Sequence, residues 1–216
     1  MLASVLICLA THDWHDDARF KAVWQMSENI QQDEIKSYVS KLLSEHAHER
    51  DKARDWFVSH PAMGRPALYE IIRAGKPVRL VKEAVSLLGK IGDEQDVSLL
   101  NGFLKKQTEV TWEAAQALAK HPSNTALNAL LDALEHSDTQ VVGAAAVALG
   151  VRGDESARKP LEKLLTNQDE SVRYRAVFAL QKLGAGPSAD VLRRHRDQEK
   201  SEAVRELIDK ALNESP

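Results

Sequence analysis

The stretch Val141–Leu149 (VVGAAAVAL) is one of four copies of the same apolar pattern in this chain. The other three copies are Leu80–Leu88 (LVKEAVSLL), Val110–Leu118 (VTWEAAQAL) and Val172–Leu180 (VRYRAVFAL). Each copy has an alanine at its centre, at positions 84, 114, 145 and 176, so successive copies are 30, 31 and 31 residues apart. A weaker fifth copy covers residues 203–211. Self-similarity at a fixed short period is the sequence signature of a repeat architecture.

A second apolar stretch precedes each copy, and its large residues are spaced by three and four, as on one face of a helix. These residues are Leu68, Ile71 and Ile72, then Leu99, Leu100, Phe103 and Leu104, then Leu127, Leu130, Leu131 and Leu134, then Leu161, Leu164 and Leu165. A polar turn follows each stretch, and Asp138 and Asp169 are placed to cap the next helix. Gly-Asp or Pro-Ser ends that helix, because glycine adopts the left-handed conformation and proline cannot continue a helix.

The repeating unit is therefore helix, turn, helix, and residues 66–212 hold about four and a half to five such units. Small anchors at the centre of each second helix are expected where neighbouring units approach closely. No alternating Val/Ile-rich segment predicts a strand, so we expect an all-α fold. Helix pairs of this kind stack into an α-solenoid in which each unit mainly touches its neighbours.

The short period, the pattern V-x-x-x-A-x-x-A-L and the Gly-Asp after the second helix resemble HEAT-type repeats. The resemblance is to the short, alanine-rich class named after phycobilisome (bilin) lyases, and it covers about residues 66–212. It implies a right-handed α-solenoid of stacked helix pairs whose second helices line the concave side. It says little about function, because such repeats serve as scaffolds, adaptors, lyase subunits and enzymes.

Residues 1–65 do not follow the repeat, and three of the four Trp and five of the eight His lie in this part. We expect helices at about 14–28, 33–48 and 50–59, and a turn at Met63–Pro66 leading into the first repeat. The end of a solenoid exposes an apolar face that needs a cap. We interpret this region as a helical N-terminal cap, and a separate binding element is the alternative.

The first ten residues (MLASVLICLA) are apolar and have the length of a signal-peptide core. They lack a positive n-region, and Ile7 precedes Cys8 where a lipoprotein site requires a small residue. We therefore expect a buried first helix and a cytoplasmic protein, with export as the alternative. No apolar run reaches the length that a membrane span needs.

Composition excludes several functional classes. The 216 residues include 29 Lys and Arg against 32 Asp and Glu, which gives a net charge of −3. A nucleic-acid binder is expected to be clearly basic, and the densest basic cluster, Arg193–Arg196, is followed by acidic residues. We therefore expect no nucleic-acid partner. A single cysteine excludes an intramolecular disulfide and a CxxC metal or redox site.

No catalytic, metal or cofactor site is predicted. His46 and His48 are two residues apart, so they point in different directions on a helix and cannot share a metal. Deoxyhypusine hydroxylase resembles this chain in repeat type and binds iron through His-Glu pairs before the anchor alanines. The corresponding pairs here are Lys82-Glu83, Trp112-Glu113, Gly143-Ala144 and Tyr174-Arg175, and none contains His. No P-loop, G-x-S-x-G or G-x-G-x-x-G motif is present.

The remaining signal is a surface on the second helices. Positions 112, 143 and 174 are expected to stack one above another, with large side chains forming a rim around a small Gly143/Ala144 floor. Trp, Tyr and Arg dominate the energetics of interfaces. The predicted partner-binding residues are Trp112, Glu113, Tyr174, Arg175 and Phe178. The alternative is that Phe178 and Trp112 only fill space between helices.

We therefore expect a non-enzymatic interaction scaffold that binds another protein or a peptide segment. The polar last repeat favours a monomer. The alternative, which the family resemblance suggests, is a subunit of a bilin or tetrapyrrole lyase, or a chaperone for cofactor attachment.

Overall fold

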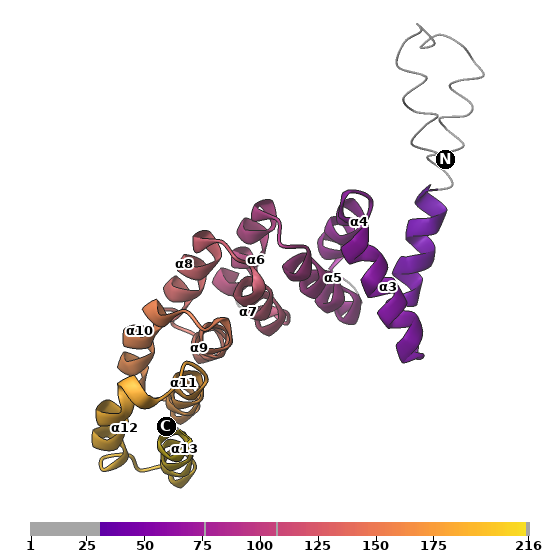
Figure 1. Cartoon of the computed structure of the whole chain (residues 1–216). Helices are drawn as coiled ribbons and strands as arrows, with labels where there is room; N and C mark the ends of the chain where they lie inside the picture. The colour runs from indigo at the N-terminus through magenta and orange to yellow at the C-terminus, as the bar shows by residue number, and fades with distance from the viewer. Residues whose placement is uncertain (1–30, 76, 107, 215–216) are drawn as a thin grey trace, which may run out of the picture. The chain divides into compact units, whose positions relative to one another are not determined.

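The computed structural model describes residues 31–75, 77–106 and 108–214 (Figure 1). The chain divides into two compact units, residues 1–56 and 57–216. In the first unit residues 31–41 are helical, and α3 (Ala47–Ser59) follows. The rings of Tyr38 and Trp56 stack with their centroids 4.6 Å apart. The expected helix 14–28 and the apolar stretch 1–10 lie outside the described residues, and the role of the first unit as a cap stays a prediction.

The helix expected over residues 33–48 is wrong in its C-terminal part, because a turn separates residue 41 from α3. The hydroxyl of Ser44 accepts a hydrogen bond from the backbone N–H of His46 at 3.1 Å and donates one to the Glu49 carboxylate. Serine side chains that bond locally in this way compete with a continuous helix. The turn therefore comes from side-chain hydrogen bonds that apolar periodicity does not report.

The second unit contains five helix pairs, and no strand occurs among the described residues. The pairs are α4 (Pro61–Ala74) with α5 (Val78–Ile91), α6 (Glu94–Lys106) with α7 (Thr111–Lys120), α8 (Asn124–Ala133) with α9 (Thr139–Arg152), η2 (Glu155–Ala157), α10 (Arg158–Lys163) and η3 (Leu164–Thr166) with α11 (Glu170–Lys182), and η4 (Gly186–Ser188) and α12 (Ala189–Arg196) with α13 (Glu202–Asn213). The predicted all-α solenoid of stacked helix pairs is confirmed.

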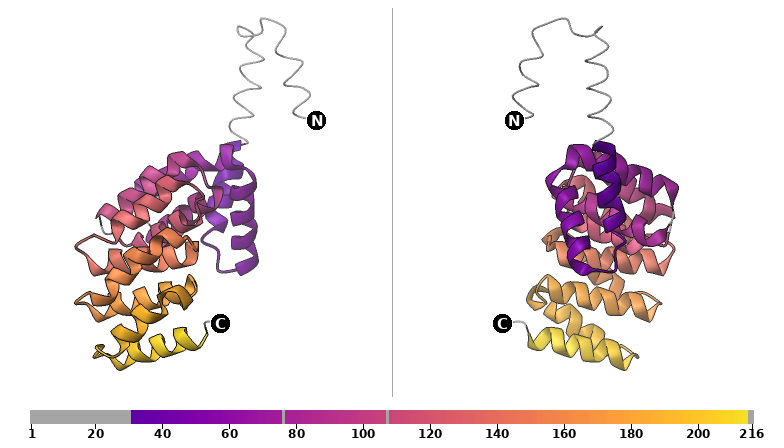
Figure 2. Two further views of the ribbon diagram at one scale, coloured as in Figure 1. Left: turned by 60° about the vertical axis from the view of Figure 1, so that its left-hand side comes forward. Right: turned by 90° about the vertical axis from the view of Figure 1, so that its right-hand side faces the viewer.

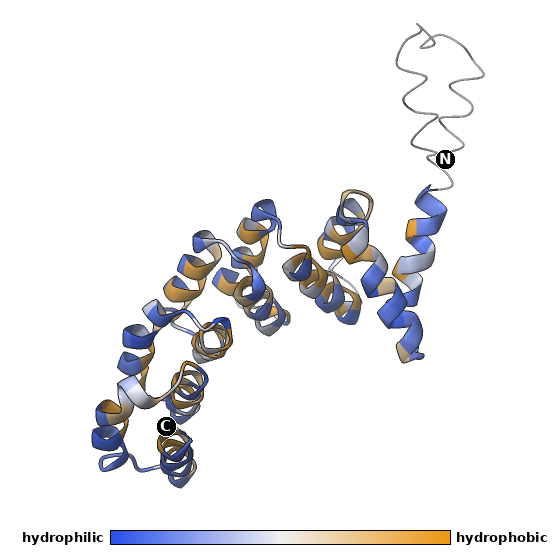
Figure 3. Cartoon of the chain, viewed as in Figure 1, coloured by the Kyte–Doolittle hydropathy of each residue, from blue (hydrophilic) through white to orange (hydrophobic). Residues whose placement is uncertain are grey.

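The second helices of the pairs form one layer and the first helices form the other (Figures 1 and 2). Within the first of these layers α5 packs on α7, α7 on α9, α9 on α11 and α11 on α13. The anchor residues Ala84, Ala114, Ala145 and Ala176 are all fully buried. Hydrophobic residues follow the helices and the connecting turns are hydrophilic (Figure 3). The hydrophobic core therefore lies between the two layers of helices and continues along their length.

The helices begin and end at capping and terminating residues that the sequence predicted. The Asp138 carboxylate accepts hydrogen bonds from the first turn of α9, and Asp169 accepts one from the Ser171 backbone N–H at 2.8 Å. Gly92 and Gly153 follow α5 and α9 in the left-handed conformation, at φ 71° and 79°. The predicted caps and stops are confirmed at these positions.

The turn expected at Met63–Pro66 is wrong, because these residues lie inside α4. Pro61 stands at the first position of that helix, where a missing N–H costs nothing. Pro66 lies only five residues further along, so the helix loses a single backbone bond near its start. The two prolines therefore mark the beginning of a helix and do not separate two elements.

Successive second helices touch through glycine and alanine. A Cβ atom added at Gly89 of α5 would lie 2.5 Å from the Ala117 Cα of α7. A Cβ atom at Gly150 of α9 would lie 2.6 Å from the Ala179 Cα of α11. Both distances are far below van der Waals contact and involve backbone, so only glycine permits this approach.

Buried ion pairing joins the last two repeats. Arg173 of α11 donates two hydrogen bonds to the Glu199 carboxylate, from Nε at 2.7 Å and from Nη2 at 2.8 Å. The same carboxylate accepts hydrogen bonds from the Ser201 backbone N–H at 2.9 Å and contacts His195 Nε2 at 2.9 Å. The guanidinium of Arg173, with these further partners, lowers the pKa of Glu199 to about 2.

We expect Gly150→Ala to destabilise the chain by about 1–3 kcal/mol, because the new methyl group overpacks the backbone of α11. The matched control is Gly102→Ala in the interior of α6, where an added Cβ has no heavy atom within 4 Å. That control should gain about 1 kcal/mol, since alanine favours the helix more than glycine does. Urea unfolding measures both, and an unchanged midpoint for Gly150→Ala would contradict the close approach.

The pH dependence of stability should report the Glu199 carboxylate. Its pKa is lowered in the folded state from 4.5 to about 2, so its contribution is complete above about pH 5 and is lost as the pH falls toward 2. Glu199→Gln should reduce stability at pH 7 and flatten the fall of the unfolding free energy between pH 5 and pH 2. Denaturant unfolding at several pH values measures this, and parallel pH profiles would show that the pair does not contribute.

Candidate functional site

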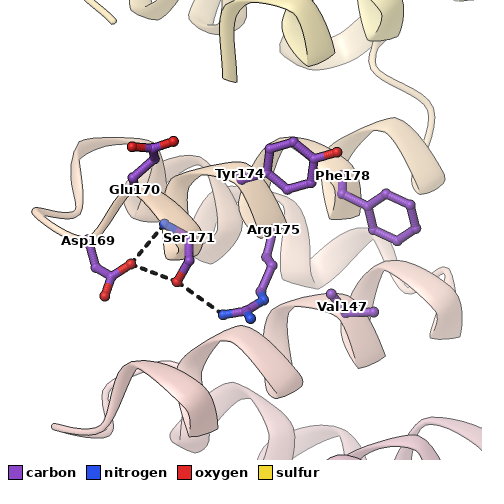
Figure 4. Close-up of a pocket in the computed structure, with 7 residues that line it drawn as sticks. All are labelled: Val147, Asp169, Glu170, Ser171, Tyr174, Arg175 and Phe178. Carbon is purple, nitrogen blue, oxygen red and sulfur yellow. Dashed lines mark hydrogen bonds between the residues drawn. The ribbon is translucent and has the colours of Figure 1, made fainter. Parts of the chain in front are cut away.

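A hollow of about 610 Å³ lies against the layer of second helices, between α9 and the start of α11 (Figure 4). Its lining residues are Val147, Asp169, Glu170, Ser171, Tyr174, Arg175 and Phe178. Three of the five predicted partner-binding residues, Tyr174, Arg175 and Phe178, are thus brought together here. Residues three and four positions apart share one face of a helix, and this spacing is what aligns them on α11.

The apolar part of the hollow is formed by Val147, Tyr174 and Phe178. Tyr174 is 42% exposed, which is high for a large apolar side chain in this chain. Phe178 is half-buried, and the Lys182 Nζ atom lies 5.3 Å from the centre of its ring. The aromatic groups therefore face solvent and are available to an incoming side chain.

Arg175 connects three successive repeats. Its guanidinium carbon lies 5.2 Å from the ring centre of Trp112 on α7, a cation–π distance. To reach Trp112 from α11 the side chain passes Gly143 of α9, where an added Cβ would lie 2.5 Å from Arg175 Nη1 and 2.6 Å from its Cδ. Nη1 also donates a hydrogen bond to Ser171 Oγ at 3.2 Å.

The small floor expected at Gly143 and Ala144 is therefore not an open surface. The Arg175 side chain covers Gly143, and Ala144 is 1% exposed. The glycine serves instead to admit the arginine, and the hollow opens beside it, over Val147.

Glu113 lies elsewhere on the layer. Lys82 Nζ of α5 is 3.0 Å from Glu113 Oε1 of α7, and Glu113 does not line the hollow. The other carboxylate oxygen of Glu113 is buried without a hydrogen-bond partner among the described residues. Trp112 is half-buried and does not line the hollow, and the guanidinium carbon of Arg175 lies 5.2 Å from its ring centre.

The acidic residues of the hollow are engaged within the protein. Asp169 accepts hydrogen bonds from the Ser171 N–H at 2.8 Å and hydroxyl at 2.6 Å, and the hydroxyl bond is the main cause that lowers the pKa of Asp169. Glu170 accepts a hydrogen bond from Ser201 Oγ at 2.7 Å. By contrast, neither Arg175 nor Lys182 has a described carboxylate within 4.0 Å.

Sequence reasoning did not select Ser171 and Lys182 as part of this surface. Ser171 lies three residues before Tyr174 and four before Arg175, and Lys182 lies four residues after Phe178 and seven after Arg175. Both therefore share the face of α11 that carries these residues. Applying helical spacing outward from Tyr174 and Arg175 finds both.

The other clusters of polar residues have fewer features of a functional site. His46 and His48 have ring centres 5.8 Å apart, and the described residues contain no group of three His, Cys, Asp or Glu side chains arranged to hold a metal. In the basic cluster Arg193–Arg196, Arg193 pairs with Asp190 at 2.9 Å and Arg196 pairs with Asp209. No helix in the described part of the chain is long and apolar enough to cross a membrane.

The HEAT repeat family matches residues 65–150 and 127–213, and the chain belongs to this family. The predicted resemblance to HEAT-type repeats is thereby confirmed. A comparison with curated proteins found no match.

Among solved structures the chain is similar to an engineered protein, with 22% identity, coverage of 83% of this chain and 95% of the other, and a TM-score of 0.48. It is also similar to the complex of CpcE and CpcF of phycocyanin lyase from Nostoc sp. PCC7120, with 21% identity, 81% and 74% coverage and a TM-score of 0.46. Human deoxyhypusine hydroxylase in complex with glycerol shares 16% identity, with 88% and 98% coverage and a TM-score of 0.45. Likenesses at this level carry no functional argument.

A double-mutant cycle should detect the contact between Trp112 and Arg175. We expect Trp112→Leu and Arg175→Gln, measured singly and together by urea unfolding, to give a coupling energy of about 0.5–1 kcal/mol. Trp112→Leu with Lys182→Gln is the control pair, because Lys182 contacts Phe178 instead, and it should be additive. Additivity in the first pair would show that the guanidinium does not rest on the indole.

Proposed function

We propose that this protein is a non-enzymatic interaction scaffold that binds another protein, or a peptide segment of one, along the layer of second helices. HEAT repeats are typical of protein-interaction scaffolds. The contact residues that we propose are Trp112, Glu113, Tyr174, Arg175 and Phe178.

The observation that carries this proposal is the composition of the hollow on α11. An exposed tyrosine, a half-buried phenylalanine and an arginine with no described carboxylate within 4.0 Å line one concave surface. Tyr and Arg, with Trp, are the residues that contribute most to binding energy in protein interfaces. Exposing these side chains to solvent does not stabilise the folded chain, whereas burying them in an interface contributes to the binding energy.

Preorganisation supports the same function. Ser171 and Trp112 hold the Arg175 guanidinium from two sides, so little side-chain entropy remains to be lost when a partner binds. The stacked helices form a rigid base for these side chains. The residues from α7 and α11 are held by helices and do not depend on a loop for their positions.

The Asp169 carboxyl group of the hollow is not poised as a general acid. A general acid that works near neutral pH needs a raised pKa, and the pKa of Asp169 is lowered, chiefly by the hydrogen bond from the Ser171 hydroxyl. The oxygen atoms of Asp169 accept hydrogen bonds from Ser171 and cap α11. Asp169 therefore supports the start of α11 and does not supply a proton.

The test is affinity capture from a lysate with the native chain and with the triple variant Tyr174→Ala/Arg175→Ala/Phe178→Ala. The control triple variant is Lys159→Ala/Lys163→Ala/Thr166→Ala, which changes exposed positions of the same repeat on the layer of first helices. All variants are first checked by circular dichroism for equal helicity and equal melting temperature.

We expect one protein to be retained by the native chain and by the control, and to be lost with the Tyr174 triple variant. Equal retention by all three chains would contradict the assignment of this surface. Adding free bilin to the native chain tests the lyase-subunit alternative: a shift in the bilin absorption that disappears in the Tyr174 triple variant would replace the scaffold function with cofactor handling.

A further inference from the structure

The charges around the hollow are arranged unevenly, and this arrangement specifies a partner. Arg175 and Lys182 lie seven residues apart on α11, about 10 Å along the helix. Each rests on an aromatic ring, Arg175 on Trp112 and Lys182 on Phe178, and neither has a carboxylate within 4.0 Å among the described residues. Two cations therefore flank the apolar part of the hollow, and no described carboxylate oxygen lies within 4.0 Å of either of them.

The acidic residues that line the hollow, Asp169 and Glu170, form hydrogen bonds with serine side chains and no ion pair with Arg175 or Lys182 within 4.0 Å. The Asp169 carboxylate accepts a hydrogen bond from the Ser171 hydroxyl at the start of α11, and the Glu170 carboxylate accepts one from the Ser201 hydroxyl. Both lie at the opposite end of the helix from Lys182. The surface is thus acidic at the beginning of α11, apolar at Tyr174 and Phe178, and basic at Arg175 and Lys182.

The guanidinium of Arg175 has bonding capacity left. It carries five N–H donors, and the described residues use one of them, in the bond from Nη1 to Ser171 Oγ. A guanidinium with unused N–H groups can bind a carboxylate through two parallel hydrogen bonds. A carboxylate is therefore the ligand group that completes this site.

We propose that the segment recognised by this scaffold carries an acidic side chain next to a large apolar side chain. The apolar side chain enters the hollow against Val147, Tyr174 and Phe178, and the carboxylate accepts hydrogen bonds from Arg175. The volume of about 610 Å³ lies within the range of about 300–1,000 Å³ that is typical of small binding sites. The inference rests on the proposed scaffold function and specifies the chemistry of its partner.

The same charges disfavour a polyanion such as a nucleic acid. Glu170 and Asp169 line the hollow beside the apolar residues, and the whole chain carries a net charge of −3. A ligand with an anion at every position would be repelled at one end of the site. A peptide with a single acid beside a large apolar residue avoids this repulsion, because its one carboxylate is placed at Arg175.

The experiment is selection of random heptapeptides, displayed on phage, against the full native chain, against Arg175→Glu and against the Tyr174→Ala/Arg175→Ala/Phe178→Ala triple variant. We expect native-selected peptides to be enriched in Asp or Glu beside Phe, Trp, Tyr or Leu, and not to bind the triple variant. Reversal of the charge in Arg175→Glu should replace the selected acid by Lys or Arg.

The best native-selected peptide then gives a quantitative test by fluorescence anisotropy. Replacing its acid by the matching amide should weaken binding to the native chain by about tenfold or more, since a charged hydrogen bond is lost. The same replacement should change binding to Arg175→Gln by less than about twofold. Lys159→Gln, an exposed lysine on α10, is the control and should behave as the native chain does.

The two ways of failing are distinct. Peptides that require Tyr174 and Phe178 but show no acid preference, or equal effects of the amide in native and Arg175→Gln chains, overturn this inference and leave the scaffold surface standing. Selected peptides that bind the triple variant as well as the native chain overturn the surface itself.

Discussion

The close approach of successive second helices is the constraint on which the rest of the structure depends. At Gly89 against Ala117 and at Gly150 against Ala179 the backbones meet with no room for a Cβ. Contacts this close are available only to small residues, and they set the separation between neighbouring repeats. The buried alanines at the centres of the same helices extend this contact along the layer. Larger side chains are thereby directed to the other faces of the helices.

The spacing set by these small residues also makes the candidate site. Arg175 reaches Trp112 because the intervening helix presents a glycine at position 143, so one side chain spans three repeats. In the site, as in the core, a small residue permits a close approach. At Gly143 the space next to the backbone is filled by the charged side chain of Arg175. Under the proposed function the same layer of helices serves both packing and partner binding, so a change in inter-repeat spacing alters both.

Polar side chains near the ends of the helices add hydrogen bonds between neighbouring repeats. Arg152 donates hydrogen bonds to the backbone carbonyls of Leu118 and Ser123, one repeat back along the chain. Arg173 and Glu199 make the corresponding link between the last two repeats. In a solenoid each repeat mainly contacts its neighbours, so such links act locally, and the site between α7 and α11 depends chiefly on the repeats that contain it.

The amino-acid sequence was sufficient to predict the period, the helix pairs, the caps at Asp138 and Asp169 and the small anchors, because these features depend on residues close in the chain. It also selected Tyr174, Arg175 and Phe178, through the alignment of the repeats and through the resemblance to HEAT-type repeats, which assigned the second helices to the concave side. It misjudged Met63–Pro66, where two prolines are compatible with the start of one helix, and the turn at Ser44, which side-chain hydrogen bonds produce. The sequence did not predict that Arg175 covers Gly143, that Glu113 pairs with Lys82 or that the hollow opens over Val147. Those contacts join side chains one or two repeats apart, and their geometry depends on how closely the helices between them pack.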